Sequence, residues 1–384
     1  MLTMFYIDNF IKVSGKNVKK SAKLNMWLEI YTFLILYFVF LFFILIYNGG
    51  DHTLVNTVSL ISFLMLVFFI LFLNYNRDIV SDSLVYQDYF NQLKLLDFKG
   101  VLEFDSRFMI GFKIWTWLNS QLYDSVRFYF GLTAVLIYLL TFISLKLSLG
   151  LKYSLIAIIC YSMYPWFALY SASGLRQGIA LAIFLLSVGY LIKGESKFSL
   201  IFLVVSFLFH KSSIIFAPIF ILMIIGISLR NVYFIYFVCI IISLFGFNEI
   251  FREYGSIFGD DVKSYFSGEA EGYIVGFRLD FLVFSISPLV VFHYFRYLYG
   301  RFSIKIEQLI KFYILANCYM LILSFVPFYD RIAAYSWYLI PMFIVFLCKE
   351  INSNLSKFTL VLGLSIINLL AFRFYNWNWY FYYG

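Results

Sequence analysis

The stretch GLRQGIALAIFLLSVGYLIK, residues 174–193, decides what kind of protein this chain forms. Beyond its arginine and glutamine it is almost entirely apolar, and about 20 such residues in a helix cross the roughly 30 Å of hydrocarbon in a bilayer. Similar runs lie on both sides of it, at about 27–47, 53–74, 126–146, 151–169, 198–226, 232–248, 278–299, 307–326, 331–348 and 356–372. The pattern predicts an integral membrane protein that spans the bilayer many times.

The composition agrees with this interpretation. Of the 384 residues, 63% are hydrophobic and 13% are charged, whereas soluble proteins contain about 45–50% apolar and about 25% charged residues. We therefore predict an all-α fold, a polytopic membrane bundle of about 11–13 transmembrane helices. It forms one multispan domain over residues 1–384, with larger outer loops at 75–125 and 249–276.

The net charge of +8 does not indicate a nucleic-acid partner. The basic residues are scattered between apolar runs, which is typical of the excess of Lys and Arg in cytoplasmic loops. If the run 198–226 crosses twice, most of these basic residues share one face, and the two larger loops lie on the opposite one. The same count places the lysine-rich N-terminus outside, against the rule, unless 108–122 is a further crossing or a re-entrant segment.

The cysteines and the known short motifs exclude several kinds of chemistry. The four cysteines, Cys160, Cys239, Cys318 and Cys348, lie inside apolar runs and form no CxxC or Cys/His pattern. We therefore expect neither a zinc site nor a disulfide framework. The sequence also has no P-loop, GxGxxG, HExxH or GxSxG motif, so nucleotide-driven transport and the commonest hydrolase mechanisms are not supported.

Charged residues at the ends or in the middle of apolar runs are the candidate functional groups. Arg176 follows a short turn and opens an apolar helix, where an arginine can hold an anion through two hydrogen bonds. The alternative is an arginine that reaches the interface, with Gly174 and Gly178 serving close helix packing.

The sequence Phe209-His210-Lys211-Ser212-Ser213 interrupts the run 198–226. A charge-bearing pair in the middle of a lipid-facing helix is costly, so we predict two helical segments that meet at a polar break. The histidine could carry a proton, donate a hydrogen bond to phosphate, or pair with a neighbouring helix.

Other candidates are carboxylates and short charged pairs. The first outer loop places carboxylates among aromatic residues, and one of them could act as a general base, although a solvated acidic loop explains them equally well. These residues are Asp78, Asp82, Asp88, Glu103 and Asp105, with Tyr86 nearby. The pairs Arg278/Asp280 and Asp330/Arg331 each open a span, where a local salt bridge is the alternative.

The order of these motifs resembles the EpsG-like and Wzy-type polysaccharide polymerases. The family pairs an Arg-Gln after a turn with a membrane-embedded Phe-His, which correspond here to Arg176-Gln177 and Phe209-His210. Weaker matches are Asp82 with Tyr86, the Arg278–Phe281 segment, and Arg331 with Pro341. The likeness extends over about residues 74–348, but residues 78–82 replace the family's glycine-containing approach to its aspartate, which leaves the corresponding aspartate open.

The resemblance implies a glycosyltransferase of the bacterial inner membrane with a GT-C-like architecture. Such an enzyme joins lipid-linked oligosaccharide repeats into O-antigen, capsule or exopolysaccharide at the periplasmic face. Its donor and acceptor would be undecaprenyl-pyrophosphate-linked glycans in the lipid bilayer, and a chain-length regulator would be a further partner.

This chemistry needs cations for the pyrophosphate, a carboxylate for the attacking hydroxyl, and apolar walls for the polyprenyl chain. We assign catalytic roles to Asp82 as the base, to Arg176 as the main pyrophosphate ligand, and to His210. The expected substrate-binding residues are Tyr86, Gln177, Lys211, Arg278, Asp280 and Arg331. No cofactor or metal ion is expected, because arginines can neutralise the leaving group.

Other functions remain as alternatives. A lipid-linked oligosaccharide flippase would be a transporter, and transporters often contain internal repeats and matching broken helices, which this chain with five prolines does not display. An O-antigen ligase or a membrane-bound O-acyltransferase would be a different transferase. A purely structural role would explain the spans but not the clustering of Arg176, His210 and Arg331 on one face.

Overall fold

The computed structural model describes residues 52–76, 79, 82–162, 164–251 and 274–363, and all regular elements among them are helices. The α-helices are α3 (His52–Asn76), α4 (Asp82–Lys94), α5 (Phe98–Glu103), α6 (Ile110–Leu122), α7 (Val126–Leu149), α8 (Leu151–Ser162), α9 (Pro165–Ala172), α10 (Leu175–Ile192), α11 (Ser196–Phe207), α12 (Ala217–Ile225), α13 (Leu229–Leu244), α15 (Leu279–Tyr299), α16 (Ile304–Ile322), α17 (Asp330–Trp337) and α18 (Ile340–Glu350), and η1 (Lys211–Phe216) is a 3₁₀ helix. The predicted all-α fold is confirmed.

Four helical units within these residues are long and apolar enough to cross a bilayer. They are α7, α10, α15, and α17 together with α18, and a fifth results if α8 and α9, bent by 77°, form one broken span. Shorter apolar helices, α11, η1 with α12, and α13, coincide with other predicted runs. The chain is thus a polytopic helical membrane protein. The predicted run at 27–47 lies outside the described residues, and the total of about 11–13 spans stays a prediction.

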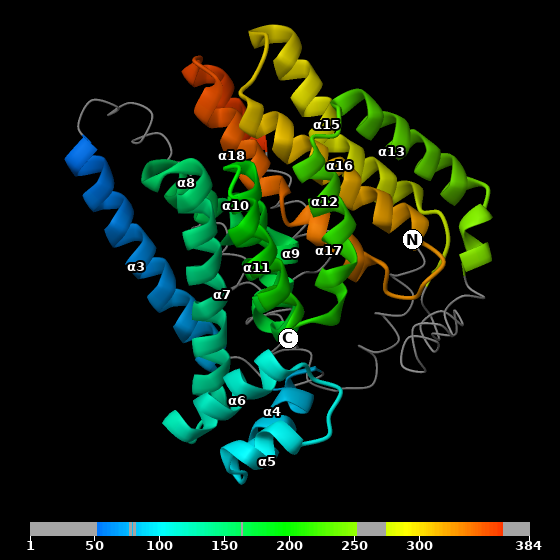
Figure 1. Cartoon of the computed structure of the whole chain (residues 1–384). Coiled ribbons are helices and arrows are strands. Elements are labelled where there is room, and N and C mark those ends of the chain that lie inside the picture. The colour runs from blue at the N-terminus through cyan, green and yellow to red at the C-terminus, as the bar shows by residue number, and fades with distance from the viewer. Residues whose placement is uncertain (1–51, 77–78, 80–81, 163, 252–273, 364–384) are drawn as a thin grey trace, which may run out of the picture.

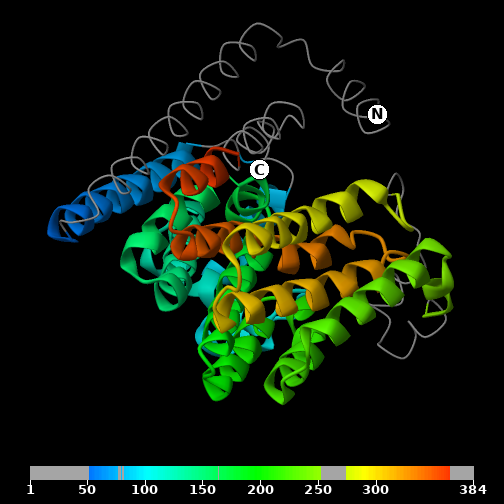
Figure 2. The ribbon, with the colours of Figure 1, turned by 90° about the horizontal axis from the view of Figure 1, so that it is seen from above.

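Helix α10 lies at the centre of this arrangement. It packs against α7 and α11, while α7 is covered on other sides by α3 and α8. In Figure 2, α3, α7 and α8 gather on one side of the molecule, and α13, α15 and α16 on the other. Because 89% of the α10 span is buried, the residues at its beginning are held by helices from several parts of the chain.

Gly178 explains how α10 approaches α9 so closely. A Cβ atom at Gly178 would lie 2.1 Å from the carbonyl oxygen of Tyr170, a distance at which no side chain fits. The role in close packing that the sequence suggested for this glycine is therefore present, and Gly178 is explained without substrate contact.

The polar break predicted in the run 198–226 is confirmed. Helix α11 ends at Phe207, His210 has extended backbone angles (φ −149°, ψ 123°), and the chain then continues as η1 and α12. The His210 side chain accepts a hydrogen bond from the Ser212 amide, which caps the new helical segment as polar N-cap residues do.

The segment predicted as the first outer loop contains a small helical subdomain that we call the cap, formed by α4, α5 and α6 (Figure 1). Helix α6 packs on α4 and α5. Its 13 residues extend about 20 Å, which is less than the hydrocarbon thickness of a bilayer. Residues 108–122 therefore do not form a full crossing.

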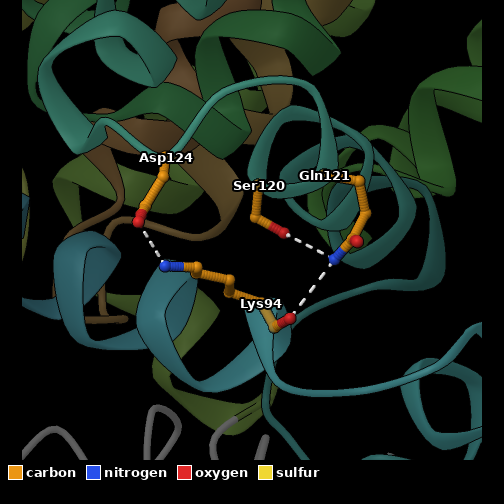
Figure 3. Close-up of polar contacts among 4 residues, drawn as sticks. All are labelled: Lys94, Ser120, Gln121 and Asp124. Carbon is orange, nitrogen blue, oxygen red and sulfur yellow. Dashed lines mark hydrogen bonds and ion pairs between the residues drawn. The ribbon is translucent and has the colours of Figure 1, made fainter.

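Polar contacts between the far ends of α4 and α6 close the cap (Figure 3). Lys94 at the end of α4 forms an ion pair with Asp124. The Gln121 side-chain amide donates to the Lys94 carbonyl oxygen at 3.3 Å and contacts the Ser120 hydroxyl at 3.5 Å. Since the Lys94 and Asp124 side chains are 37% and 68% exposed, this ion pair adds little stability, and apolar packing must hold the cap together.

Candidate functional site

The candidate site lies where the cap meets the start of α10 and the break before η1, and the start of α17 lies close to both. A backbone hydrogen bond joins the cap to the break, because the Gly111 amide donates to the Leu208 carbonyl oxygen at 2.8 Å. A Cβ atom at Gly111 would lie 2.8 Å from that same oxygen. Glycine at this position thus allows the cap to sit directly against the break that carries His210.

Arg176 is the second residue of α10, and its side chain extends toward the cap. The guanidinium carbon lies 4.4 Å from the ring centroid of Phe108, within the range of a cation–π interaction. The Nε atom is buried and has no hydrogen-bond partner in the described structure. The contact with Phe108 holds the guanidinium next to the ring, and the guanidinium carries the hydrogen-bond donors that a phosphate requires.

Tyr86 belongs to α4 of the cap and lies next to Arg176. Burial raises the pKa of this tyrosine, whereas the charge of Arg176 and a hydrogen bond with it lower the pKa in part. The side chain is only 5% exposed. Tyr86 therefore contacts the arginine that we expect to bind pyrophosphate, and it is positioned to steady that arginine.

Asp82 is the first residue of α4, one helical turn before Tyr86. It is exposed, and its charge raises the pKa of Tyr86, so the carboxylate lies close to the same tyrosine that contacts Arg176. An exposed carboxylate beside a cation is a suitable general base for a sugar hydroxyl. Asp78, the other aspartate considered for this role, lies outside the described residues.

His210 is surrounded by positive charge. Burial lowers the pKa of His210 to about 3, and the nearby charges of Arg176 and Arg331 contribute to the decrease. The imidazole Nδ1 lies 2.6 Å from the Ser212 hydroxyl, which lies 3.0 Å from the Tyr335 hydroxyl. The histidine is therefore neutral at neutral pH and can take part in hydrogen bonds, but it does not supply a third cation.

Arg331 reaches the site from the start of α17. Its guanidinium carbon lies 4.8 Å from the Phe328 ring centroid, and its side chain is exposed. Phe328 has a positive φ of 60°, the one such non-glycine value among the described residues. A bulky residue in this conformation is strained, and such strain is often found at functional sites.

Gln177 does not point into open space as a substrate-binding side chain would. It is 4% exposed, and its amide nitrogen donates to the main-chain oxygen of Arg331 at 2.6 Å. The side chain thus connects the beginning of α10 to the beginning of α17. The prediction of direct contact with substrate stays untested, and the geometry favours a connecting role.

Arg278 and Asp280 form a pair with each other. Arg278 Nε donates to an Asp280 oxygen at 3.1 Å, and its guanidinium lies 3.7 Å from the Phe281 ring centroid. Both charges act on the pKa of Tyr329, which places the pair beside the turn that precedes Arg331. This is the local salt bridge that the sequence left as the alternative, and a role in substrate binding stays a prediction.

Lys211 is the last of the predicted site residues, and the possible metal ligands are described with it. Lys211 is exposed and follows His210 directly, at the rim of the site. Within the described part of the chain, no three His, Cys, Asp or Glu side chains gather as metal ligands do. The four cysteines are buried and unlinked, as small core residues are.

Several residues of the site were not identified from the sequence. Phe108 beneath Arg176 and the strained Phe328 show no local signal. Tyr335 stands four residues after Arg331, and this helical spacing would have placed it on the same face of α17. Gly111 is a single glycine in a predicted loop, where nothing distinguishes it from a turn residue.

Comparison with protein families identifies one match. The model of the EpsG family matches residues 56–383, which includes every described residue named in the site. No curated protein matches the chain, and no solved structure does so.

Proposed function

The chain belongs to the EpsG family, which is associated with polysaccharide polymerases, and on that premise we propose that it is a repeat-unit polymerase. It joins undecaprenyl-pyrophosphate-linked oligosaccharides into O-antigen, capsule or exopolysaccharide at the periplasmic face of the bacterial inner membrane. The observation that carries the proposal is that Arg176 and Arg331 both lie close to His210, although they come from two helices far apart in sequence that the bond from Gln177 to the Arg331 main-chain oxygen joins.

Two arginines around an uncharged histidine suit a dianionic or more highly charged group. The pyrophosphate that links glycan to lipid is such a group, and guanidinium forks match its oxygens. His210 can add a hydrogen bond without adding charge.

Asp82 and the two arginines have different roles in the proposed glycosyl transfer. The hydroxyl oxygen of the acceptor glycan forms a bond to the anomeric carbon of the donor, and its proton passes to the Asp82 carboxylate. The bond from the anomeric carbon to the pyrophosphate oxygen breaks, and the leaving undecaprenyl pyrophosphate retains the electron pair. Arg176 and Arg331 stabilise the negative charge that develops on that oxygen.

The test is a gene deletion complemented with variants, read from a gel of the cell's polysaccharide. The wild-type gene is expected to restore a ladder of polymer lengths, and Arg176→Ala and Arg331→Ala are expected to leave single repeats. Arg301→Ala is the matched control, because Arg301 is an exposed arginine that follows the far end of α15. Comparable amounts of each variant in the membrane are verified by immunoblot.

The pattern left by the deletion separates the proposal from its alternatives. Repeat units retained on the cytoplasmic face would indicate a flippase, and long polymer that stays lipid-linked would indicate a ligase. Polymer of normal length without acyl groups would indicate an acyltransferase. A full ladder with both arginine variants would remove these residues from the mechanism.

A further inference from the structure

Gln177 occupies an unusual position for a residue beside the main candidate ligand. It follows Arg176 directly at the start of α10, yet its side chain is 4% exposed, whereas the Arg331 side chain is exposed. A substrate that reaches the two arginines does not reach the Gln177 amide without displacing the α17 backbone.

The hydrogen bond from the Gln177 side chain to the Arg331 main-chain oxygen is additional to the regular backbone hydrogen bonds of α17. A carbonyl oxygen has two lone pairs, and one serves the helix while the other remains available. The Arg331 oxygen uses this capacity to accept from Gln177 at 2.6 Å. The bond joins α10 to α17, two segments separated by 154 positions in the sequence.

The start of α17 needs such a support. The preceding Phe328 has a strained φ of 60°, a conformation that persists only where the surrounding structure holds it. Two arginines that act on the same histidine also repel each other. A neutral donor between the two helices holds the second arginine near the first without adding charge.

We propose that Gln177 is a positioning residue, which holds Arg331 beside Arg176 through the Arg331 main-chain oxygen and does not contact substrate. This inference rests on the proposed function in one respect, the binding of pyrophosphate by the two arginines. It assigns the two residues of the Arg-Gln pair to different tasks: Arg176 binds the anion, and Gln177 places the other cation.

The test measures binding of inorganic pyrophosphate to the full-length protein in detergent by calorimetry, which does not require polymerase activity. Gln177→Met keeps the length of the side chain and removes the donor. Its affinity is expected to fall about three- to tenfold, the range for a lost hydrogen bond that acts indirectly. Gln121→Met is the matched control, since Gln121 also donates to a main-chain oxygen (Figure 3). It lies ten residues along α6 from Gly111, where the cap contacts the break, and the affinity of this variant should equal that of the wild type.

The distinguishing measurement combines Gln177→Met with Arg331→Ala. If Gln177 acts through Arg331, the double variant binds pyrophosphate as weakly as Arg331→Ala alone. If Gln177→Met weakens binding by the same factor with and without Arg331, Gln177 acts directly or through Arg176, and the proposal is wrong. Wild-type affinity in Gln177→Met would overturn it as well.

The remaining outcomes separate this proposal from the proposed function. Absence of pyrophosphate binding in the wild type, together with full polymer in Arg176→Ala, contradicts the proposed function and removes the basis of this inference. If Gln177→Met does not fold, Gln177→Leu provides a second apolar replacement. Size-exclusion profiles identify which variants are folded.

Discussion

The neutral histidine is the feature at the residue scale that is most accessible to experiment. Because the pKa of His210 is about 3 in the folded protein and near 6.5 in an unfolded chain, the unfolded state binds a proton that the folded state does not. The stabilising effect of the neutral histidine is complete above about pH 6.5 and is lost as the pH falls toward 3. At pH 5 the loss amounts to about 2 kcal/mol.

We therefore expect His210→Gln to flatten the dependence of thermal stability on pH. The wild-type melting temperature in detergent should fall between pH 7 and pH 5, and that of the variant should fall less. The other two histidines are present in both proteins, so their contributions to the pH dependence cancel when the two curves are compared. Parallel curves would show that His210 is charged or exposed in solution.

Charged residues within apolar sequence predicted much of the candidate site. Arg176, His210 and Arg331 were predicted as functional residues because an ionisable group in a membrane helix is costly, and the structure brings them together. The contacts that orient them could not be predicted in the same way. The Phe108 ring under Arg176 and the strained Phe328 depend on tertiary packing, which residue type does not reveal.

At the scale of the helices, two glycines of α10 contribute to its packing in different ways. A Cβ atom at Gly178 would meet the Tyr170 carbonyl oxygen at 2.1 Å, and one at Gly189 would meet the Ser148 hydroxyl at 2.9 Å. The carbonyl belongs to helix α9 and cannot move alone, whereas a serine hydroxyl can rotate. Gly178→Ala should therefore destabilise the protein by about 1–3 kcal/mol or more, and Gly189→Ala by much less.

Thermal unfolding of both variants in detergent provides the measurement. Equal melting temperatures for Gly178→Ala and Gly189→Ala would show that α9 does not press against α10 as described. The two variants are well matched, since each substitution adds one methyl group to the same helix.

The contact between the cap and the polar break gives a second prediction for an element. Gly111→Ala would force the cap away from Leu208, because the new Cβ atom would lie 2.8 Å from that carbonyl oxygen. Tyr86 and Asp82 would move with the cap, so polymer yield should fall several-fold while membrane insertion continues. Gly100→Ala is the control within the cap, where the nearest atom at 3.0 Å belongs to the side chain of Asp97. A normal ladder from Gly111→Ala would separate the cap from catalysis.

The cap itself was the main element that the sequence did not predict. Residues 75–125 were interpreted as an outer loop because no apolar run of membrane length occurs there, yet they contain three helices. Short helices with mixed polar and apolar residues lack the signal that identifies spans. By contrast, the break at His210 was predicted, since a charged pair within an apolar run has few structural explanations.

The arrangement of the whole molecule predicts that the cap and the segment after α15 face opposite sides of the membrane. Lys99, whose side chain is 80% exposed, belongs to the cap, and Arg301 is exposed after the end of α15. The native cysteines are buried and should label poorly. In whole cells with a permeable outer barrier, a membrane-impermeant thiol reagent should label Lys99→Cys but not Arg301→Cys, which should react only after the inner membrane is opened. The reverse result would invert the proposed orientation.

The two arginines around a neutral histidine also have a consequence for the timing of the proposed reaction. Groups that hold the pyrophosphate of a bound donor hold the freed lipid pyrophosphate by the same interactions, so the product competes with the next donor for the site. Exchange of the freed lipid for the next donor is then a step of every cycle, in addition to formation of the glycosidic bond. Accumulation of the spent carrier in the membrane would slow polymer growth even when repeat units are abundant.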